Sequence, residues 1–368
     1  MPQRPPQRPG YDPTQPWNEL PELPPAPQLE TPVVLKACIG ARSALARVNA
    51  LSEALPNPAI LIHSIPLQEA RSSSQIEDIV TTSDALYEAL AAEGAASDPS
   101  AKEVLRYREA LWEGMEHLAA RPVLNAPAFE RICSRIRGVQ VRVRGAERVA
   151  IVTAARRAIY TPPAGADHIQ RLLGNLERFL HDDSGGLDPL IKMAVMHYQF
   201  EAIHPFTDGN GRTGRILNLL YLVQQKLLHA PIIYLSRFFI EHREHYYQGL
   251  RGVTERADWR GWLLFMLEAV AETAQDTIGR LEDISRLAER MQEQARSSAR
   301  AGRREGFVEI LFKWPYCKIG IVQRELQCSR ITAKRYLDEM ASLGLLEQVR
   351  RGRSYYYINT QLVELLGD

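Results

Sequence analysis

The spacing of apolar residues predicts that most of this chain is helical. Between residues 33 and 120, apolar residues recur three and four positions apart, as in VVLKACIGARSALARVNAL and KEVLRYREALWEGMEHLAA. The same period returns over residues 168–182, 189–202, 211–228 and 239–274. Because a helix brings residues three and four apart onto one face, these segments predict a helical bundle in the middle of the protein.

One segment of the middle region alternates instead. Residues 138–161 place valines between arginines and end directly before Pro162 and Pro163. A period of two puts successive side chains on opposite faces of a strand. This segment therefore predicts a short β-hairpin.

The two ends of the chain differ from the middle. Residues 1–32 hold nearly half of the prolines and predict an extended arm with no core of its own. Residues 277–304 are charged, with sparse apolar positions, and predict a connecting helix. Residues 305–368 predict three short helices, with Ser329 as an N-cap and Gly344 as a C-cap, and then a hairpin turning at Arg351-Gly352. Three helices and a hairpin indicate a winged helix.

Composition and charge narrow the classes of protein only a little. The chain has 368 residues, 45% hydrophobic and 24% charged, which is enough to bury a sizeable core in more than one domain. Its net charge of +1 excludes a global field that would attract nucleic acid or an anionic membrane. The four cysteines lack C-x-x-C spacing and no apolar run is long enough to span a membrane. We expect a cytoplasmic protein with no membrane partner.

The segment HPFTDGNGRTGR, residues 204–215, concentrates chemistry between two apolar helical runs. Its three glycines allow close approach of a ligand to the backbone, and the helix that opens near Gly211 directs unpaired N–H groups and its positive dipole end toward the loop. Arg212 and Arg215 lie three apart on that helix and can both donate to phosphate oxygens. This combination predicts a polyphosphate site.

Two further residues of the segment predict catalysis. Asp208 offers a hard oxygen ligand, and Mg²⁺ is usually held by one carboxylate together with substrate phosphates and waters. His204, with an ordinary pKa of about 6.5, can accept a proton from an attacking hydroxyl near neutral pH. Phe206 is expected to be a core anchor. The predicted base, the predicted metal ligand and the two phosphate-binding arginines thus all lie within residues 204–215.

The segment resembles the signature of the Fic family, H-x-F-x-[DE]-G-N-G-R-x-x-R, and matches every specified position. Flanking sequences resemble the family too: MHYQFEAIHPF, APIIYLS, EHREHYYQGL and DWRGWLLFML. The resemblance covers residues 33–274 and implies a mainly α Fic-type bundle with a short β-hairpin flap, plus the C-terminal winged helix of a bacterial subgroup. The expected regions are the arm 1–32, an N-terminal helical region 33–125 with an inhibitory helix, the Fic catalytic core 126–276, the connecting helix 277–304 and the winged helix 305–368.

The resemblance also implies an activity, namely Mg²⁺-dependent transfer of AMP from ATP to a serine, threonine or tyrosine hydroxyl of a target protein, with the chain itself as one candidate target. His204 would be the catalytic base and Asp208 the magnesium ligand. Gly209, Asn210, Gly211, Arg212 and Arg215 would hold the phosphates, and Tyr247 would face the adenine. The flap around residues 149–159 would align the target segment by strand addition. The G-N-G-R form resembles members that transfer AMP, whereas the Doc branch, which transfers phosphate, differs there.

Residues 69–90 resemble the autoinhibitory helix of the family, with the core [ST]-x-x-x-E-[GN]. Ser73 and Glu77 match this core, and Asp78 stands where the family has glycine or asparagine. The resemblance implies that Glu77 pairs with Arg215 and keeps ATP in an unreactive pose. At Asp78 the close approach or the charge balance of the turn is expected to differ.

Other functions remain open from the sequence. The same site permits the reverse reaction, deAMPylation, with Glu77 positioning water, and the phosphate cradle does not read the base of the nucleotide. The winged helix suggests a DNA-binding regulator, with Arg330, Lys334 and Arg335 in a groove and Arg351 and Arg353 on phosphate. A winged helix also serves as a protein-interaction module, and a homodimer is left open.

Overall fold

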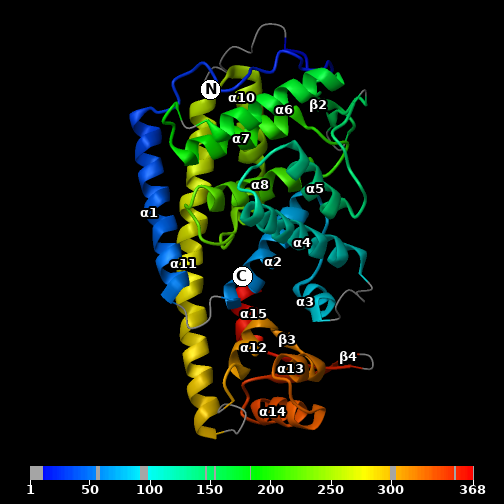
Figure 1. Ribbon diagram of the computed structural model, residues 1–368, viewed down its shortest axis with the longest axis vertical. Helices are drawn as coiled ribbons and strands as arrows, with labels where there is room; N and C mark the ends of the chain where they lie inside the picture. Colours follow the sequence, from blue (N-terminus) through cyan, green and yellow to red (C-terminus); the bar gives the residue numbers. More distant parts are fainter. Residues whose placement is uncertain are drawn as a thin grey trace.

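The computed structural model describes residues 11–54, 59–91, 98–145, 147–152, 155–182, 184–298, 304–351 and 354–367. Within these residues the chain forms fifteen helices and five short strands, which confirms the expected mainly α fold class. Figure 1 shows a helical upper body, a smaller C-terminal domain below it and one long helix that runs beside both. No helix in the described ranges is long and apolar enough to cross a membrane.

Two helices form the centre of the upper body. These are α7 (Pro189–Ile203) and α8 (Asn210–Gln224), and nearly all of their residues are buried. A helix that is apolar on every side must be covered on every side. Here α4 (Pro99–Ala120), α5 (Ala126–Arg137) and α6 (Ala166–His181) provide that cover, together with α11.

The long helix is α11, which runs without a break from Trp259 to Ser298. It packs along α1 (Pro32–Ala54) and contacts α9 (Leu235–Glu241) and α10 (Arg243–Arg256). The expected connecting helix, 277–304, is therefore the second half of α11 over its described part, and the expected boundary at 276/277 falls inside one helix. Apolar residues three and four apart remain buried beyond that boundary, namely Ile278, Leu281, Ile284, Leu287 and Met291.

The proline-rich arm has no helix over residues 11–31 and lies across the top of the body in Figure 1. Its apolar residues Trp17, Leu20, Leu23 and Leu29 are buried against the rest of the chain. Asn175 of α6 fixes the arm by accepting from the N–H of Leu23 and donating to its carbonyl, at 2.7 and 2.9 Å. The arm is thus extended but packed. Residues 1–10 lie outside the described residues.

The expected hairpin over 138–161 is shorter than the alternating pattern suggested. Only Ile151–Val152 (β1) and Ala158–Tyr160 (β2) pair as antiparallel strands among the described residues of this segment. The described residues between α5 and β1 form no strand, and Arg144 among them turns inward and is 3% exposed. Its guanidinium donates to the carbonyls of Ile203 and His204, which the end of α7 leaves without helical partners.

The expected inhibitory helix over 69–90 is two helices joined by a turn. Helix α2 (Ala59–Ile76) ends one residue before Glu77, and α3 (Ser83–Ala91) begins after the turn. Asp78 has a φ of +60°, a left-handed conformation that only glycine adopts freely and that asparagine and aspartate tolerate better than most residues. This backbone conformation explains why a helix cannot continue through the segment.

The C-terminal domain has the element order of the expected winged helix. Three helices are followed by two strands of five residues each, and a two-residue strand, β3, lies between the first two helices; the sheet order is β3-β5-β4. Ser329 caps its helix by accepting from the N–H of Thr332, and Gly344 has a φ of +71° just after it. The elements are α12 (Phe307–Lys313), β3 (Tyr316–Cys317), α13 (Ile319–Glu325), α14 (Arg330–Ser342), β4 (Glu347–Arg351), β5 (Ser354–Ile358) and a further helix, α15 (Thr360–Gly367).

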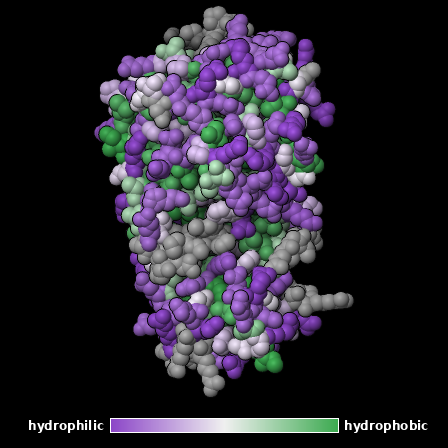
Figure 2. Space-filling view, viewed as in Figure 1, coloured by the Kyte–Doolittle hydropathy of each residue, from purple (hydrophilic) through white to green (hydrophobic). Residues whose placement is uncertain are grey.

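The surface of α14 carries both signs of charge. Lys334 pairs with Asp338 at 2.5 Å and Arg335 approaches Glu339 at 4.0 Å, so two of the three basic residues of α14 considered for DNA contact have acidic neighbours. Arg353 lies outside the described residues. On the face seen in Figure 2 the surface is largely hydrophilic, with hydrophobic residues in small separate groups. All four cysteines are free thiols.

Candidate active site

The signature segment forms a loop between α7 and α8. His204 ends α7 in a left-handed conformation with φ +50°, and Gly209, with φ +85°, precedes the first residue of α8. Asn210 closes the loop, since its side chain accepts from the N–H of Phe206 and donates to the carbonyl of the same residue, at 2.9 and 2.8 Å. Phe206 is fully buried, as expected of an anchor. The side chain of Asn210 therefore shapes the loop, and its backbone N–H belongs to the first turn of α8.

His204 is held as a neutral ring. Its Nδ1 is buried and has no hydrogen-bond partner among the described residues. Burial, and then the guanidinium of Arg144, lower the pKa of His204 to about 4. A buried neutral imidazole with a free nitrogen can accept a proton at neutral pH.

The lowered pKa predicts how stability depends on pH. The unfolded chain has a histidine pKa of about 6.5, so it binds more protons than the folded chain between about pH 6.5 and pH 4. The stabilisation is fully present above pH 6.5 and is lost as the pH falls toward 4. At pH 5 the loss from His204 is roughly 2 kcal/mol. In urea titrations at pH 7 and pH 5, His204→Asn should show a smaller drop than the parent, and equal drops would contradict this prediction.

Asp208 lies at the mouth of the loop with its side chain 55% exposed. One carboxylate oxygen accepts from the N–H of Gly209 at 2.6 Å, and the other contacts the guanidinium of Arg137, the last residue of α5. In the described part of the chain, no three histidine, cysteine or acidic side chains come together as a metal site. A magnesium ion here would fit with Asp208 as its one protein ligand and phosphate and water oxygens as the others.

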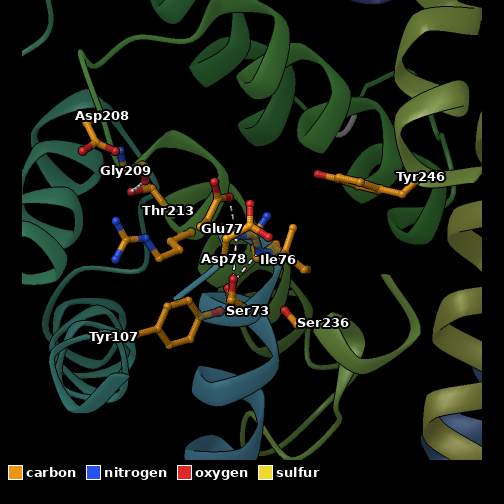
Figure 3. A network of polar contacts seen from close by, with 12 residues as sticks. Ser73, Ile76, Glu77, Asp78, Tyr107, Asp208, Gly209, Thr213, Ser236 and Tyr246 are labelled. Atoms are coloured by element: carbon orange, nitrogen blue, oxygen red, sulfur yellow. Dashed lines mark hydrogen bonds and ion pairs between the residues drawn. The ribbon is translucent and has the colours of Figure 1, made fainter. Parts of the chain in front are cut away.

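Arg215 is almost fully buried and is held by the segment around Glu77, of which Figure 3 labels Ser73, Ile76, Glu77 and Asp78. Its Nε donates to Ser73 Oγ at 2.8 Å, and its Nη2 donates to the Ser73 carbonyl at 3.0 Å and to Glu77 Oε1 at 2.8 Å. Burial alone would raise the pKa of Glu77, but Arg215 outweighs burial and lowers it. Both ion-pair partners are charged at neutral pH.

Gly211 makes this contact sterically feasible. A Cβ on Gly211 would lie 2.5 Å from Glu77 Oε1 and 3.0 Å from Arg215 Nη1. Such separations are too short for a real side chain, so a larger residue at position 211 would push the carboxylate away. One glycine of the signature therefore serves both the loop and the inhibitory segment.

The turn after Glu77 is tied to α10. Arg243 donates to the carbonyl of Ile76 at 2.8 Å and to Asp78 Oδ1 at 3.0 Å. The Asp78 side chain is 80% exposed, so this ion pair contributes little stability. The charge of Asp78 is thus directed at Arg243 and away from Arg215.

Arg212 and Tyr247 occupy different sides of the site. Arg212 is 3% exposed and pairs with Glu103 of α4 at 2.5 Å, while its Nε is buried without a partner among the described residues. Tyr246 is in the core and its hydroxyl bonds to His197 at 2.9 Å, whereas Tyr247 is only half-buried. Burial and then the charge of Glu77 raise the pKa of Tyr247. Adenine contact by Tyr247 stays a prediction.

Three residues near the site were not expected from the sequence: Arg137, Arg144 and Glu201. The first two come from segments far from the signature, and nothing in their local pattern marked them. Glu201 did carry a signal, because it lies three residues before His204 and thus on a neighbouring face of the same helix.

Sequence models of known families match three parts of the chain. The Fic/DOC family N-terminal model matches residues 35–116, the Fic/DOC family model residues 124–222, and the C-terminal domain of SoFic-like protein adenylyltransferases residues 287–362. The chain therefore contains two domains of the Fic/DOC family, one after the other. Its C-terminal domain is of the SoFic-like type.

Individual relatives agree with these matches. Protein adenylyltransferase fic-1 of Caenorhabditis elegans is 31% identical over 124 residues, which are 33% of this chain and 23% of the relative. Protein adenylyltransferase Fic of Drosophila melanogaster is 32% identical over 112 residues, 30% of this chain and 21% of the relative. The chain thus spans less than a quarter of the length of these curated relatives.

Solved structures show the same fold. A Fic family protein from Desulfovibrio desulfuricans G20 has a TM-score of 0.58 at 20% identity, and the match covers 89% of this chain and 96% of the other. A structure of Fic-1 from C. elegans has a TM-score of 0.52 at 19% identity, and the match covers 68% of this chain and 73% of the other.

Proposed function

We propose that this chain transfers AMP from ATP to a serine, threonine or tyrosine hydroxyl of a target protein. The observation that carries the proposal is the convergence, within one loop and one helical turn, of a neutral His204, the carboxylate of Asp208, the N-terminal turn of α8 and the buried Arg215. The curated relatives are named protein adenylyltransferases, which supports the same activity. The catalytic region would be residues 126–276.

The reaction needs one bond to form and one to break. The target hydroxyl oxygen attacks the α-phosphorus, its proton passes to His204, and pyrophosphate leaves. The backbone N–H groups that open α8 and the guanidinium of Arg215 stabilise the spreading negative charge. When bound, Mg²⁺ would neutralise the α- and β-phosphates, with Asp208 as its protein ligand. The edge of the β1–β2 flap would align the target segment by strand addition.

In the described conformation this site would be inhibited. The N–H groups of Arg215 already donate to Ser73 and Glu77, so this guanidinium cannot complete the binding of the γ-phosphate. Glu77 also adds a negative charge where the phosphates would lie. We therefore assign Ser73 and Glu77 to an inhibitory contact.

Two labelled nucleotides test the activity. The Glu77→Gly protein is incubated with Mg²⁺ and either α-labelled or γ-labelled ATP, together with a lysate as a source of targets. Stable label on protein from α-labelled ATP alone is expected for AMP transfer. Protein label from γ-labelled ATP alone would indicate phosphate transfer, and the absence of both, with ATP binding intact, would count against the proposal.

A further inference from the structure

A second carboxylate lies beside Arg215. Glu201 is on α7, and its Oε1 is buried with no hydrogen-bond partner among the described residues. It faces the backbone of α8, since a Cβ on Gly214 would clash with that oxygen. Gly211, three residues earlier on α8, faces Glu77 in the same way. The two carboxylates therefore approach the same helix at two glycines three residues apart, and the charge of Arg215 lowers the pKa of both.

The facing helices explain why Glu201 points there. His197 and Glu201 lie four residues apart on α7 and so share a face, and His204 follows as the C-cap of the helix. His197 meets α8 one turn away, where Asn218 bonds to its Nδ1 at 3.2 Å. Glu201 occupies the position between this contact and the signature loop, at the level of Arg215.

We propose that Glu201 is a positioning residue that takes over Arg215 when Glu77 withdraws, and that it holds the guanidinium in place for the phosphates. The inference rests on the proposed inhibition by Glu77. In the inhibited state Glu77 forms an ion pair with the guanidinium, whereas the influence of Arg215 on Glu201 is electrostatic and lowers the pKa of Glu201. When Glu77 withdraws and before a nucleotide binds, the buried Arg215 loses the one ion-pair partner that it has among the described residues, and an unpaired buried charge is costly. Glu201 supplies the missing partner without a change in the backbone.

The charges around Glu201 are consistent with this exchange. Burial raises the pKa of Glu201 to about 7, Arg215 lowers it, and Glu77 raises it. Removing Glu77 therefore lowers the pKa of Glu201 and favours its charged form at neutral pH. The other titratable neighbours add no carboxylate: His197 stays neutral because burial lowers its pKa to about 3, His204 has a lowered pKa, and burial raises the pKa of Tyr246 far above its usual range.

A thermal cycle tests the exchange without any nucleotide. The melting temperature is measured at pH 8 for the parent, Glu77→Gly, Glu201→Gln and the double variant. Glutamine keeps the shape of Glu201 but removes its charge. We expect Glu201→Gln to lower the melting temperature by about 2 °C or less in the parent and by about 5 °C or more in Glu77→Gly. Equal shifts in the two backgrounds would overturn the proposal, whether or not the protein transfers AMP.

The pH dependence of transfer provides a second measurement. Transfer by Glu77→Gly should fall as the pH drops below the lowered pKa of Glu201 and Glu201 takes up a proton, whereas the double variant should be roughly tenfold less active at pH 8 and lack this decline. A purely structural role would lower transfer equally at every pH and keep the decline. Glu244→Gln, at an exposed carboxylate on α10, is the control and should leave the profile of Glu77→Gly unchanged.

Discussion

Replacing His204 by alanine in the Glu77→Gly protein is expected to reduce AMP transfer by about 1,000-fold. His204 is the neutral base of the loop, with a buried Nδ1 that no described residue contacts by a hydrogen bond and a pKa lowered to about 4. In its absence the attacking hydroxyl would have to lose its proton to water. The measurement is the initial rate of label transfer from α-labelled ATP at saturating nucleotide.

Two controls make the loss at His204 interpretable. ATP affinity should change by no more than about threefold, because the phosphates are held by α8 and its arginines and not by the ring. His245→Ala removes an exposed histidine of α10 and should leave the rate unchanged. A folded His204→Ala variant that retains more than about a tenth of the rate would show that another group takes the proton.

Replacing Glu77 by glycine is expected to raise transfer by roughly 10- to 100-fold. The substitution removes the carboxylate that holds Arg215 at 2.8 Å and the negative charge beside the phosphate positions. The contacts of Ser73 with Arg215 remain in this variant. Ser73→Ala removes the hydroxyl that accepts from Arg215 but keeps Glu77, so it should raise transfer by a smaller factor. Rates are compared with the parent at equal concentrations of Mg²⁺ and ATP.

The neighbouring acid provides a matched control for Glu77. Asp78 is exposed, pairs with Arg243 instead of Arg215 and has a positive φ that asparagine tolerates. Asp78→Asn should therefore alter transfer by less than about twofold. If Glu77→Gly is folded and no faster than the parent, or if Asp78→Asn activates as strongly, Arg215 is not what limits the reaction.

Asp78 differs from the residue that the family has at this position, and the structure gives the physical reason why aspartate fits there. The sequence showed an aspartate where the family has glycine or asparagine, and the expectation was a changed approach or charge balance. The structure shows that the position requires a left-handed backbone, which aspartate can adopt, and that Arg243 takes up its charge. The family's glycine or asparagine at this position and the aspartate of this chain thus have one physical explanation, the φ of +60°.

The alternating segment before the flap shows the opposite case. Valines and arginines at period two predicted strands over 138–161, but Arg144 is used at the end of α7 and the ladder is confined to β1 and β2 in the described residues. The carbonyls that Arg144 satisfies belong to residues 59 and 60 positions later in the chain. A local pattern contains no information on such a partner, so the pattern alone overestimated the hairpin.

The sequence by itself determined the helical class of the protein, the arrangement of the C-terminal domain and the composition of the signature loop, because these depend on local periodicity, caps and short motifs. Only the tertiary structure decided which charges meet. Arg215 pairs with a residue 138 positions away and Arg212 with one 109 positions away. Glu201 reaches the backbone of α8 because α7 and α8 pack together with Gly214 at their contact. Such contacts, and the pKa values that follow from burial, arise only when distant segments share one desolvated space.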